Sequence, residues 1–142
     1  MNTPEVITHL EPYEVFVFGS NSEGKHSGGA AKIAHQKFGA VWGEGVGHFG
    51  QTYAIPTLQF PSTETGEAVK MSLDDIDTHV QDFLDYAWWN PSLTFYVTKL
   101  GCGIAGFKVE EIAPLFHDAL LIQNIILPKE FEDFNNIKIT ID

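Results

Sequence analysis

The chain of 142 residues contains no arginine: all eight of its basic residues are lysines, and with 19 acidic residues the formal net charge is −11 at pH 7. Proteins that hold long nucleic acids neutralise many phosphates with basic side chains, and no basic run is present here. The guanidinium fork that grips a phosphate through two hydrogen bonds is also missing. A phosphate bound by this chain must therefore be held by backbone N–H groups, helix N-termini, hydroxyls or a lysine.

Cysteine and long apolar runs are equally scarce. Cys102 is the single cysteine, which excludes an internal disulfide and agrees with a reducing, cytoplasmic location. No stretch approaches the run of about 20 apolar residues that crosses a bilayer, and residues 1–10 lack the features of a signal peptide. The histidines and Cys102 show no metal-ligand spacing. We therefore expect no membrane, no long nucleic acid, no metal and no cofactor.

Apolar strand patterns alternate with helical patterns along the chain. We expect strands at residues 14–18, 53–56, 93–98, 125–127 and 137–141, and helices at 30–38, 72–90 and 109–119. Pro56 is expected to keep its strand at a sheet edge or a strand end, and the glycine-rich stretch 39–50 is expected to be a loop. This order predicts a single α/β/α domain of three layers over residues 1–142, with a mixed, partly parallel sheet.

The first glycine-rich segment, Gly19–Gly29, follows the first predicted strand. In sheets of this kind, ligands bind at the carboxyl ends of the strands. Gly28 and Gly29 place the smallest side chains at a helix start, where N–H groups and the helix dipole attract a phosphate. The same residues also suit a tight turn packed on the sheet, so both interpretations stay open.

Part of this segment matches the phosphate-binding P-loop. Gly19 and Gly24-Lys25 agree with the first seven positions of the pattern G-x-x-x-x-G-K-[ST]. His26 stands at the eighth position, where a hydroxyl is needed to hold Mg²⁺. A degenerate P-loop nucleotide-binding protein is therefore the least favoured interpretation.

The second glycine-rich segment, Gly101–Gly106, follows the strand predicted at 93–98. Three glycines in six positions suit a loop whose backbone wraps around a diphosphate, and the ring of Phe107 can then cover a base or a ribose. Cys102 lies inside this loop. Its thiolate can be a nucleophile if nearby N–H groups lower its pKa, or Cys102 can be merely a small buried residue.

Four segments in this order resemble the macrodomain family, whose members bind ADP-ribose and sometimes hydrolyse its conjugates. They are Gly19-Ser20-Asn21, the helix start at 28–34, the stretch 50–56, and Gly101–Phe107, and the resemblance spans roughly residues 14 to 119. The opening strands and the adenine-contacting acid of many macrodomains have no counterpart, so the chain resembles a trimmed or divergent member. The resemblance implies a macrodomain-like fold and a small nucleotide partner, ADP-ribose or a related NAD-derived molecule.

Two functions follow from this resemblance, a hydrolase of ADP-ribosyl linkages and a non-catalytic module that reads or sequesters the nucleotide. In the hydrolase, Asn21 and His26 would orient the attacking water. Asn21 can equally satisfy its own turn, and a loop histidine such as His26 is often merely exposed to solvent. The residues expected to bind the ligand are Gly19, Ser20, Gly28, Gly29, Ala30, Thr52, Tyr53, Gly101, Cys102, Gly103, Ile104, Ala105, Gly106 and Phe107.

Overall fold

A computed structural model describes residues 1–60 and 66–141, with side chains through residue 136. Within these residues one sheet has the strand order β2-β3-β1-β5-β6, and β4 pairs with β3. The strands are β1 (Glu14–Asn21), β2 (Gly47–Phe49), β3 (Thr52–Gln59), β4 (Val69–Lys70), β5 (Thr94–Val97) and β6 (Ile125–Ile126). The helices are α1 (Gly29–Ile33), η1 (Ala34–Phe38), α2 (Leu73–Trp88), α3 (Val109–Ile112), η2 (Ala113–Leu121) and α4 (Lys129–Ile141).

The sheet is mixed, as predicted. β1 pairs in parallel with β3 and β5, and β5 pairs in parallel with β6. The short strands β2 and β4 both run antiparallel to β3. The carboxyl ends of β1, β3 and β5 therefore meet at one edge of the sheet.

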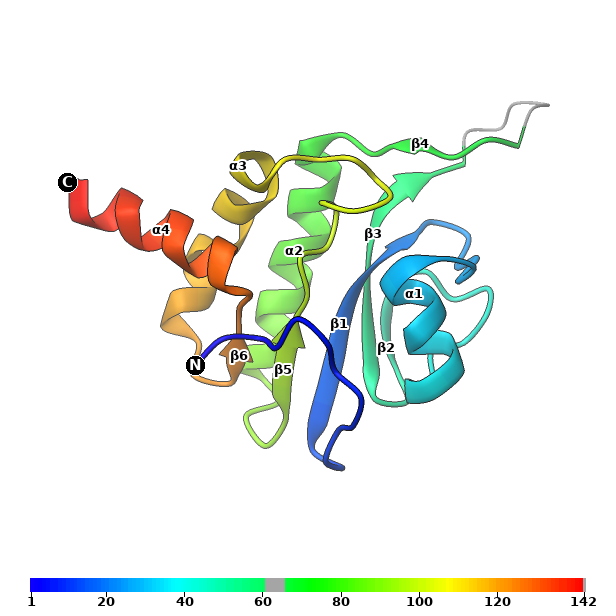
Figure 1. Cartoon of the computed structure of the whole chain (residues 1–142), viewed down its shortest axis with the longest axis horizontal. Coiled ribbons are helices and arrows are strands. Elements are labelled where there is room, and N and C mark those ends of the chain that lie inside the picture. Colours follow the sequence, from blue (N-terminus) through cyan, green and yellow to red (C-terminus); the bar gives the residue numbers. More distant parts are fainter. Residues whose placement is uncertain (61–65, 142) are drawn as a thin grey trace.

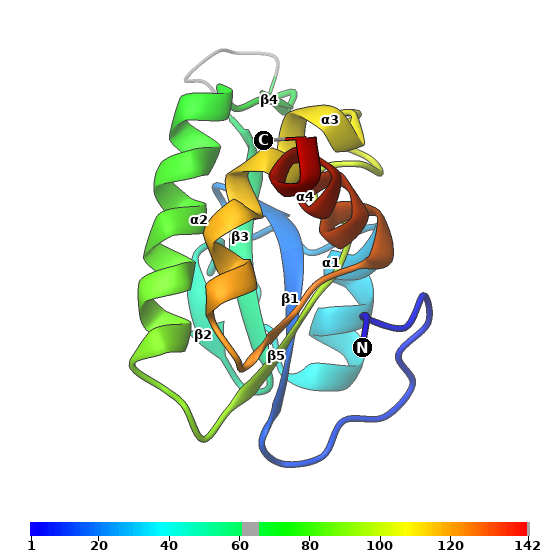
Figure 2. The same ribbon diagram turned by 90° about the vertical axis from the view of Figure 1, so that its left-hand side faces the viewer.

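Helices cover both faces of this sheet (Figures 1 and 2). Successive side chains of a strand point to opposite faces, so the apolar residues of β1 contribute to a core on each side. Val15 and Val17 of β1 pack into a cluster with α2, α3, η2 and α4. Phe16 and Phe18 pack on the other face, where the Phe16 and Phe38 rings lie 5.3 Å apart. Burial on both faces explains the unbroken apolar run of β1 and confirms the predicted α/β class.

Local interactions explain where the predicted helices begin and end. Ser72 caps α2 by accepting a hydrogen bond from the Asp75 N–H at 3.1 Å, which stabilises a helix start by about 1 kcal/mol. The helix expected at 30–38 continues from α1 into η1 and ends at Gly39, which has a φ of +91°. The third predicted helix changes to 3₁₀ geometry at Ala113, one residue before Pro114. No helix among the described residues has the length and hydropathy of a membrane span.

The strand predicted at 137–141 is wrong, because these residues form the end of α4. This helix follows Pro128 and is anchored by contacts distant in sequence. Phe131, on its first turns, is completely buried and stacks on Phe116 of η2. One turn later, Asn135 donates a hydrogen bond to the Ala113 carbonyl at 2.8 Å. Such packing outweighs the local preference of an isoleucine-rich segment for a strand.

The expected edge position of the 53–56 strand is also wrong, since β3 lies inside the sheet between β2 and β1. Its pairing with β2 ends at Ala54 and its pairing with β4 begins at Leu58, so Pro56 falls in the gap between these partners. A residue without an N–H is therefore tolerated there. The loop expected at 39–50 is interrupted by β2.

Candidate functional site

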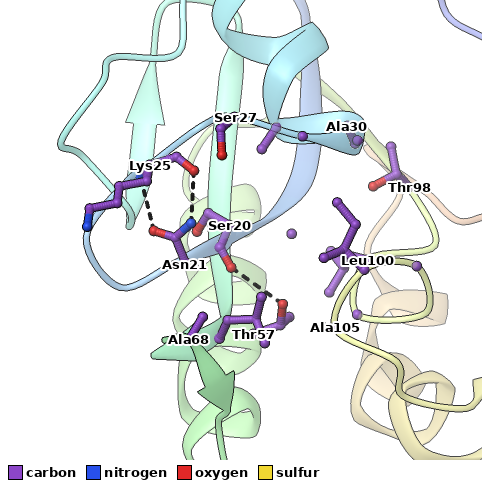
Figure 3. Close-up of a pocket in the computed structure, with 18 of the residues that line it drawn as sticks. Ser20, Asn21, Lys25, Ser27, Ala30, Thr57, Ala68, Thr98, Leu100 and Ala105 are labelled. Atoms are coloured by element: carbon purple, nitrogen blue, oxygen red, sulfur yellow. Dashed lines mark hydrogen bonds between the residues drawn. The ribbon is translucent and has the colours of Figure 1, made fainter. Parts of the chain in front are cut away.

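A cavity of about 490 Å³ opens at the carboxyl edge of the sheet (Figure 3). Both glycine-rich segments line it, together with the ends of β3 and β5. The lining consists of residues 19–21, 25, 27–31, 57, 58, 60, 68, 98–101 and 103–105. The two segments, 70 residues and more apart in the sequence, therefore contribute to one site.

The chain topology explains why the cavity forms here. β1 and β5 are neighbours in the sheet, and both run toward this edge. The segment after β1 leads to α1 on one face, whereas the segment after β5 leads to α3 on the other face. Two neighbouring strands whose connections diverge in this way leave a crevice between them, which is where open α/β sheets bind ligands.

Glycines stand where the two segments touch. A Cβ at Gly19 would lie 3.2 Å from the Leu100 Cβ and 3.3 Å from the Gly101 nitrogen. A Cβ at Gly28 would lie 3.1 Å from Cδ1 of Ile104, a side chain that is 75% exposed. The backbones therefore approach each other closely, with Ile104 over the start of α1.

The charged groups of the lining are all cationic. Among the described residues that line the cavity, Lys25 and Lys99 carry charge and no carboxylate is present. Lys99 forms an ion pair with Glu130 at 2.8 Å, which raises the pKa of Lys99 and lowers that of Glu130. Lys70 donates a hydrogen bond to the Gly106 carbonyl at 3.0 Å. The described lining therefore carries no acidic side chain, in a chain with 19 of them, and both of its lysines pair with glutamates outside the lining.

Asn21 lines the cavity, but its amide is occupied by its own loop. Its Oδ1 accepts from the Lys25 N–H, and its Nδ2 donates to the Lys25 carbonyl, both at 2.9 Å. The Lys25 side chain extends away from the cavity centre in Figure 3, and its ammonium pairs with Glu23. The turn-forming interpretation of Asn21 therefore agrees with the geometry.

His26 does not line the cavity. Its side chain lies on the far side of the loop, only 2% exposed, and its Nε2 lies 3.0 Å from the Val41 carbonyl. Burial lowers the pKa of this imidazole, although the neighbouring backbone opposes the shift. The expectation of a solvent-exposed histidine is wrong, and a water-activating role has no geometric basis.

Thr52 and Tyr53 lie at the opposite end of β3 from the cavity. Thr52 pairs with Phe16 and donates to the Phe49 carbonyl at 2.6 Å. Tyr53 packs on Phe83 with ring centroids 5.0 Å apart, and burial raises its pKa to about 12. Thr57 instead reaches the cavity, five residues and about 16 Å further along the strand. The ligand contacts expected of Thr52 and Tyr53 are therefore not supported.

The second segment divides between cavity and core. Gly101, Gly103, Ile104 and Ala105 line the cavity, whereas Cys102, Gly106 and Phe107 are not among the lining residues. Burial raises the pKa of the Cys102 thiol, the reverse of what a nucleophile needs. Phe107 is 7% exposed and belongs to the core cluster with α2, so its ring does not cover the cavity.

Several lining residues were not anticipated from the sequence. They are Lys25, Ser27, Ala31, Thr57, Leu58, Phe60, Ala68, Thr98, Lys99 and Leu100. Thr98 and Lys99 end or follow a predicted strand, a signal that can identify them. Phe60 and Ala68 carry no such signal, because only the pairing of β3 with β4 brings them to this edge.

No protein-family model matches this sequence, and comparisons with curated proteins and with solved structures give no match either. The similarity to macrodomains therefore rests on the four segments described above. Within the described residues, no group of three or more histidine, cysteine or acidic side chains is placed to hold a metal ion.

Proposed function

We propose that the cavity binds ADP-ribose or a closely related NAD-derived nucleotide, and that the protein is a binding module. The observation that carries this proposal is the cavity at the diverging β1 and β5 connections, lined by both glycine-rich segments and, among its described residues, by two lysines and no acidic residue. Its volume of about 490 Å³ lies in the range of small-molecule sites, about 300–1,000 Å³.

Backbone capture of the phosphates fits the composition of the chain. The first N–H groups of a helix have no partner within the helix, and Gly28 caps α1 without any side-chain hydrogen bond. Opposite it, a Cβ at Gly103 would meet no atom of the described residues within 4 Å, so that backbone is accessible. A diphosphate between these segments needs no arginine, in agreement with the absence of that residue.

The chemistry of the lining favours binding over hydrolysis. Removing a proton from water near neutral pH needs a base of matching pKa. The titratable groups in the described lining are lysines, whose ordinary pKa is about 10.4. The hydrolase alternative relied on Asn21 and His26, and their placement does not favour it.

The P-loop alternative also loses support. In a P-loop the helix starts at the Gly-Lys pair and the lysine reaches the phosphates. Here α1 begins at Gly29, four residues after Lys25. The Lys25 ammonium lies 4.6 Å from the centre of the Phe60 ring and 3.0 Å from Glu23.

Calorimetric titration with ADP-ribose tests the proposal, with Gly103→Asp as the blocking variant. We expect saturable binding that persists in EDTA, and a loss of at least tenfold in affinity when a carboxylate is placed at position 103. Ser92→Asp is the matched control, because it adds the same charge at an exposed position before β5. No heat at millimolar ADP-ribose, or equal affinity of both variants, would refute the site.

Incubation with an ADP-ribosylated peptide tests the non-catalytic part separately. We expect no release of ADP-ribose above the rate in buffer. Release of ADP-ribose by the wild type that is lost in Asn21→Ala would support the hydrolase alternative. Nucleotide binding that requires Mg²⁺ and disappears in Lys25→Ala would favour the P-loop interpretation.

A further inference from the structure

His26 is the buried side chain of a segment whose neighbouring residues face the proposed ligand. Lys25 and Ser27 line the cavity, whereas the His26 ring turns the other way. It meets Phe18 and Trp42 edge-on, with ring centroids 5.4 and 6.3 Å away. The His26 imidazole therefore packs against the core on the side of the first glycine-rich segment that faces away from the cavity.

The protonation state of this imidazole follows from its partners. Nε2 faces the Val41 carbonyl at 3.0 Å, so Nε2 carries the proton and donates it. Nδ1 is buried and has no hydrogen-bond partner among the described residues. Burial outweighs the carbonyl groups of Val41 and Glu44, which favour the charged ring, and the pKa is lowered. His26 is thus neutral at physiological pH.

Residues 41–45 form the support on which the first glycine-rich segment rests, and we call them the backing segment. The Gly43 N–H donates to the Gly24 carbonyl at 3.0 Å, and the Ser20 hydroxyl donates to the Gly45 carbonyl. A Cβ at Gly45 would overlap the Asn21 carbonyl oxygen. The hydrogen bond between His26 and Val41 also joins the two segments, and it does so at the residue next to Ser27, which lines the cavity.

We propose that His26 is a positioning residue of the cavity, which fixes the backbone of residues 24–28 against the backing segment. This inference rests on the proposed function, because it states that His26 maintains the shape of the proposed ADP-ribose site. Protonation would place a second N–H donor and a charge in an apolar enclosure. Among the described residues, the titratable group that faces the ring is His35 of η1, with ring centroids 6.0 Å apart, whereas the backing segment presents backbone groups of Val41 and Glu44, and Phe18 of β1 is uncharged.

Two variants separate positioning from simple packing. His26→Phe keeps a ring but removes the donor to Val41. His26→Gln keeps a neutral N–H donor at the reach of Nε2 and cannot be protonated. His9→Gln is the matched control, since His9 is exposed and distant from the cavity. We expect His26→Phe to weaken ADP-ribose binding at least tenfold at pH 7.5, with His26→Gln and His9→Gln within about threefold of the wild type.

The pH profile and amide exchange provide readouts that packing alone would not move. As the pH falls from 7.5 through the range in which the native His26 ring takes up a proton, located by NMR of its ring protons, the wild-type affinity should fall relative to that of His26→Gln, because ADP-ribose binds the form with neutral His26. Protection of the Gly43 amide, corrected for intrinsic exchange, should drop in His26→Phe and recover in His26→Gln.

The outcomes distinguish the two proposals. If the wild type binds no ADP-ribose, the proposed function fails, and Gly43 protection still decides the positioning role. Unchanged protection in His26→Phe, or His26→Gln binding as weakly as His26→Phe, overturns positioning. If His26→Phe does not fold, a wild-type pH profile parallel to that of His26→Gln overturns it.

Discussion

Acidification should destabilise this protein through His26, and His26→Gln should remove that part of the loss. The native imidazole is 2% exposed, and its pKa is lowered by burial. In the unfolded chain the same group titrates at about 6.5. Below that pH the unfolded state binds a proton that the native state rejects, so unfolding becomes more favourable as the pH falls toward the native pKa.

The magnitude follows from this linkage. At pH 5.5, one unit below the unfolded pKa, proton uptake stabilises the unfolded chain by RT ln 11, about 1.4 kcal/mol, if the native ring stays neutral. At pH 8 the same quantity is close to zero. Partial protonation of the native ring at this pH reduces the difference, and we expect about 1 kcal/mol.

Urea unfolding at pH 8.0, 6.5 and 5.5 measures the effect for the wild type, His26→Gln and the exposed control His9→Gln. The free energy of unfolding of His26→Gln should lie below that of the wild type at pH 8.0, because the substitution disturbs the packing around Phe18. That gap should narrow by about 1 kcal/mol at pH 5.5, whereas the gap to His9→Gln stays constant. A gap for His26→Gln that is independent of pH would refute the assignment of a buried neutral imidazole.

Further predictions concern the close backbone contact at Gly45, the cavity-lining Lys99 and the cap of α2. Gly45→Ala should lower the free energy of unfolding in urea by about 2 kcal/mol, because the added Cβ meets backbone atoms. Gly103→Ala should change it by no more than about 0.5 kcal/mol, because a Cβ there meets no described atom within 4 Å. Equal effects of the two substitutions would contradict this reasoning. Lys99→Gln should weaken ADP-ribose about fivefold by calorimetry, whereas Lys129→Gln, outside the lining, should leave it unchanged. Ser72→Ala should lower the midpoint of thermal unfolding through a loss of about 1 kcal/mol, and an unchanged midpoint would mean that the cap contributes nothing.

Much of the architecture follows from local patterns in the sequence. The apolar run of β1 required burial on both faces, and Ser72 with its acidic first turn marked the start of α2. Glycine-rich segments after two parallel strands had to reach the same edge of the sheet, and Gly19 and Gly101 do line one cavity. The absence of arginine likewise restricts how an anion can be held there, whatever the fold.

Only the tertiary structure decided which side chains of those segments face the cavity. His26 and Ser27 are adjacent in sequence, yet one is buried behind the loop and the other lines the site. Thr52, expected to contact the ligand, begins β3 and lies away from the cavity, because the length of a strand depends on its partners in the sheet. The orientation of a loop side chain is set in the same way, by contacts such as His26 with Val41 that join residues distant along the chain. Local sequence patterns determined which backbone segments form this site, and long-range packing determined which of their side chains face the cavity.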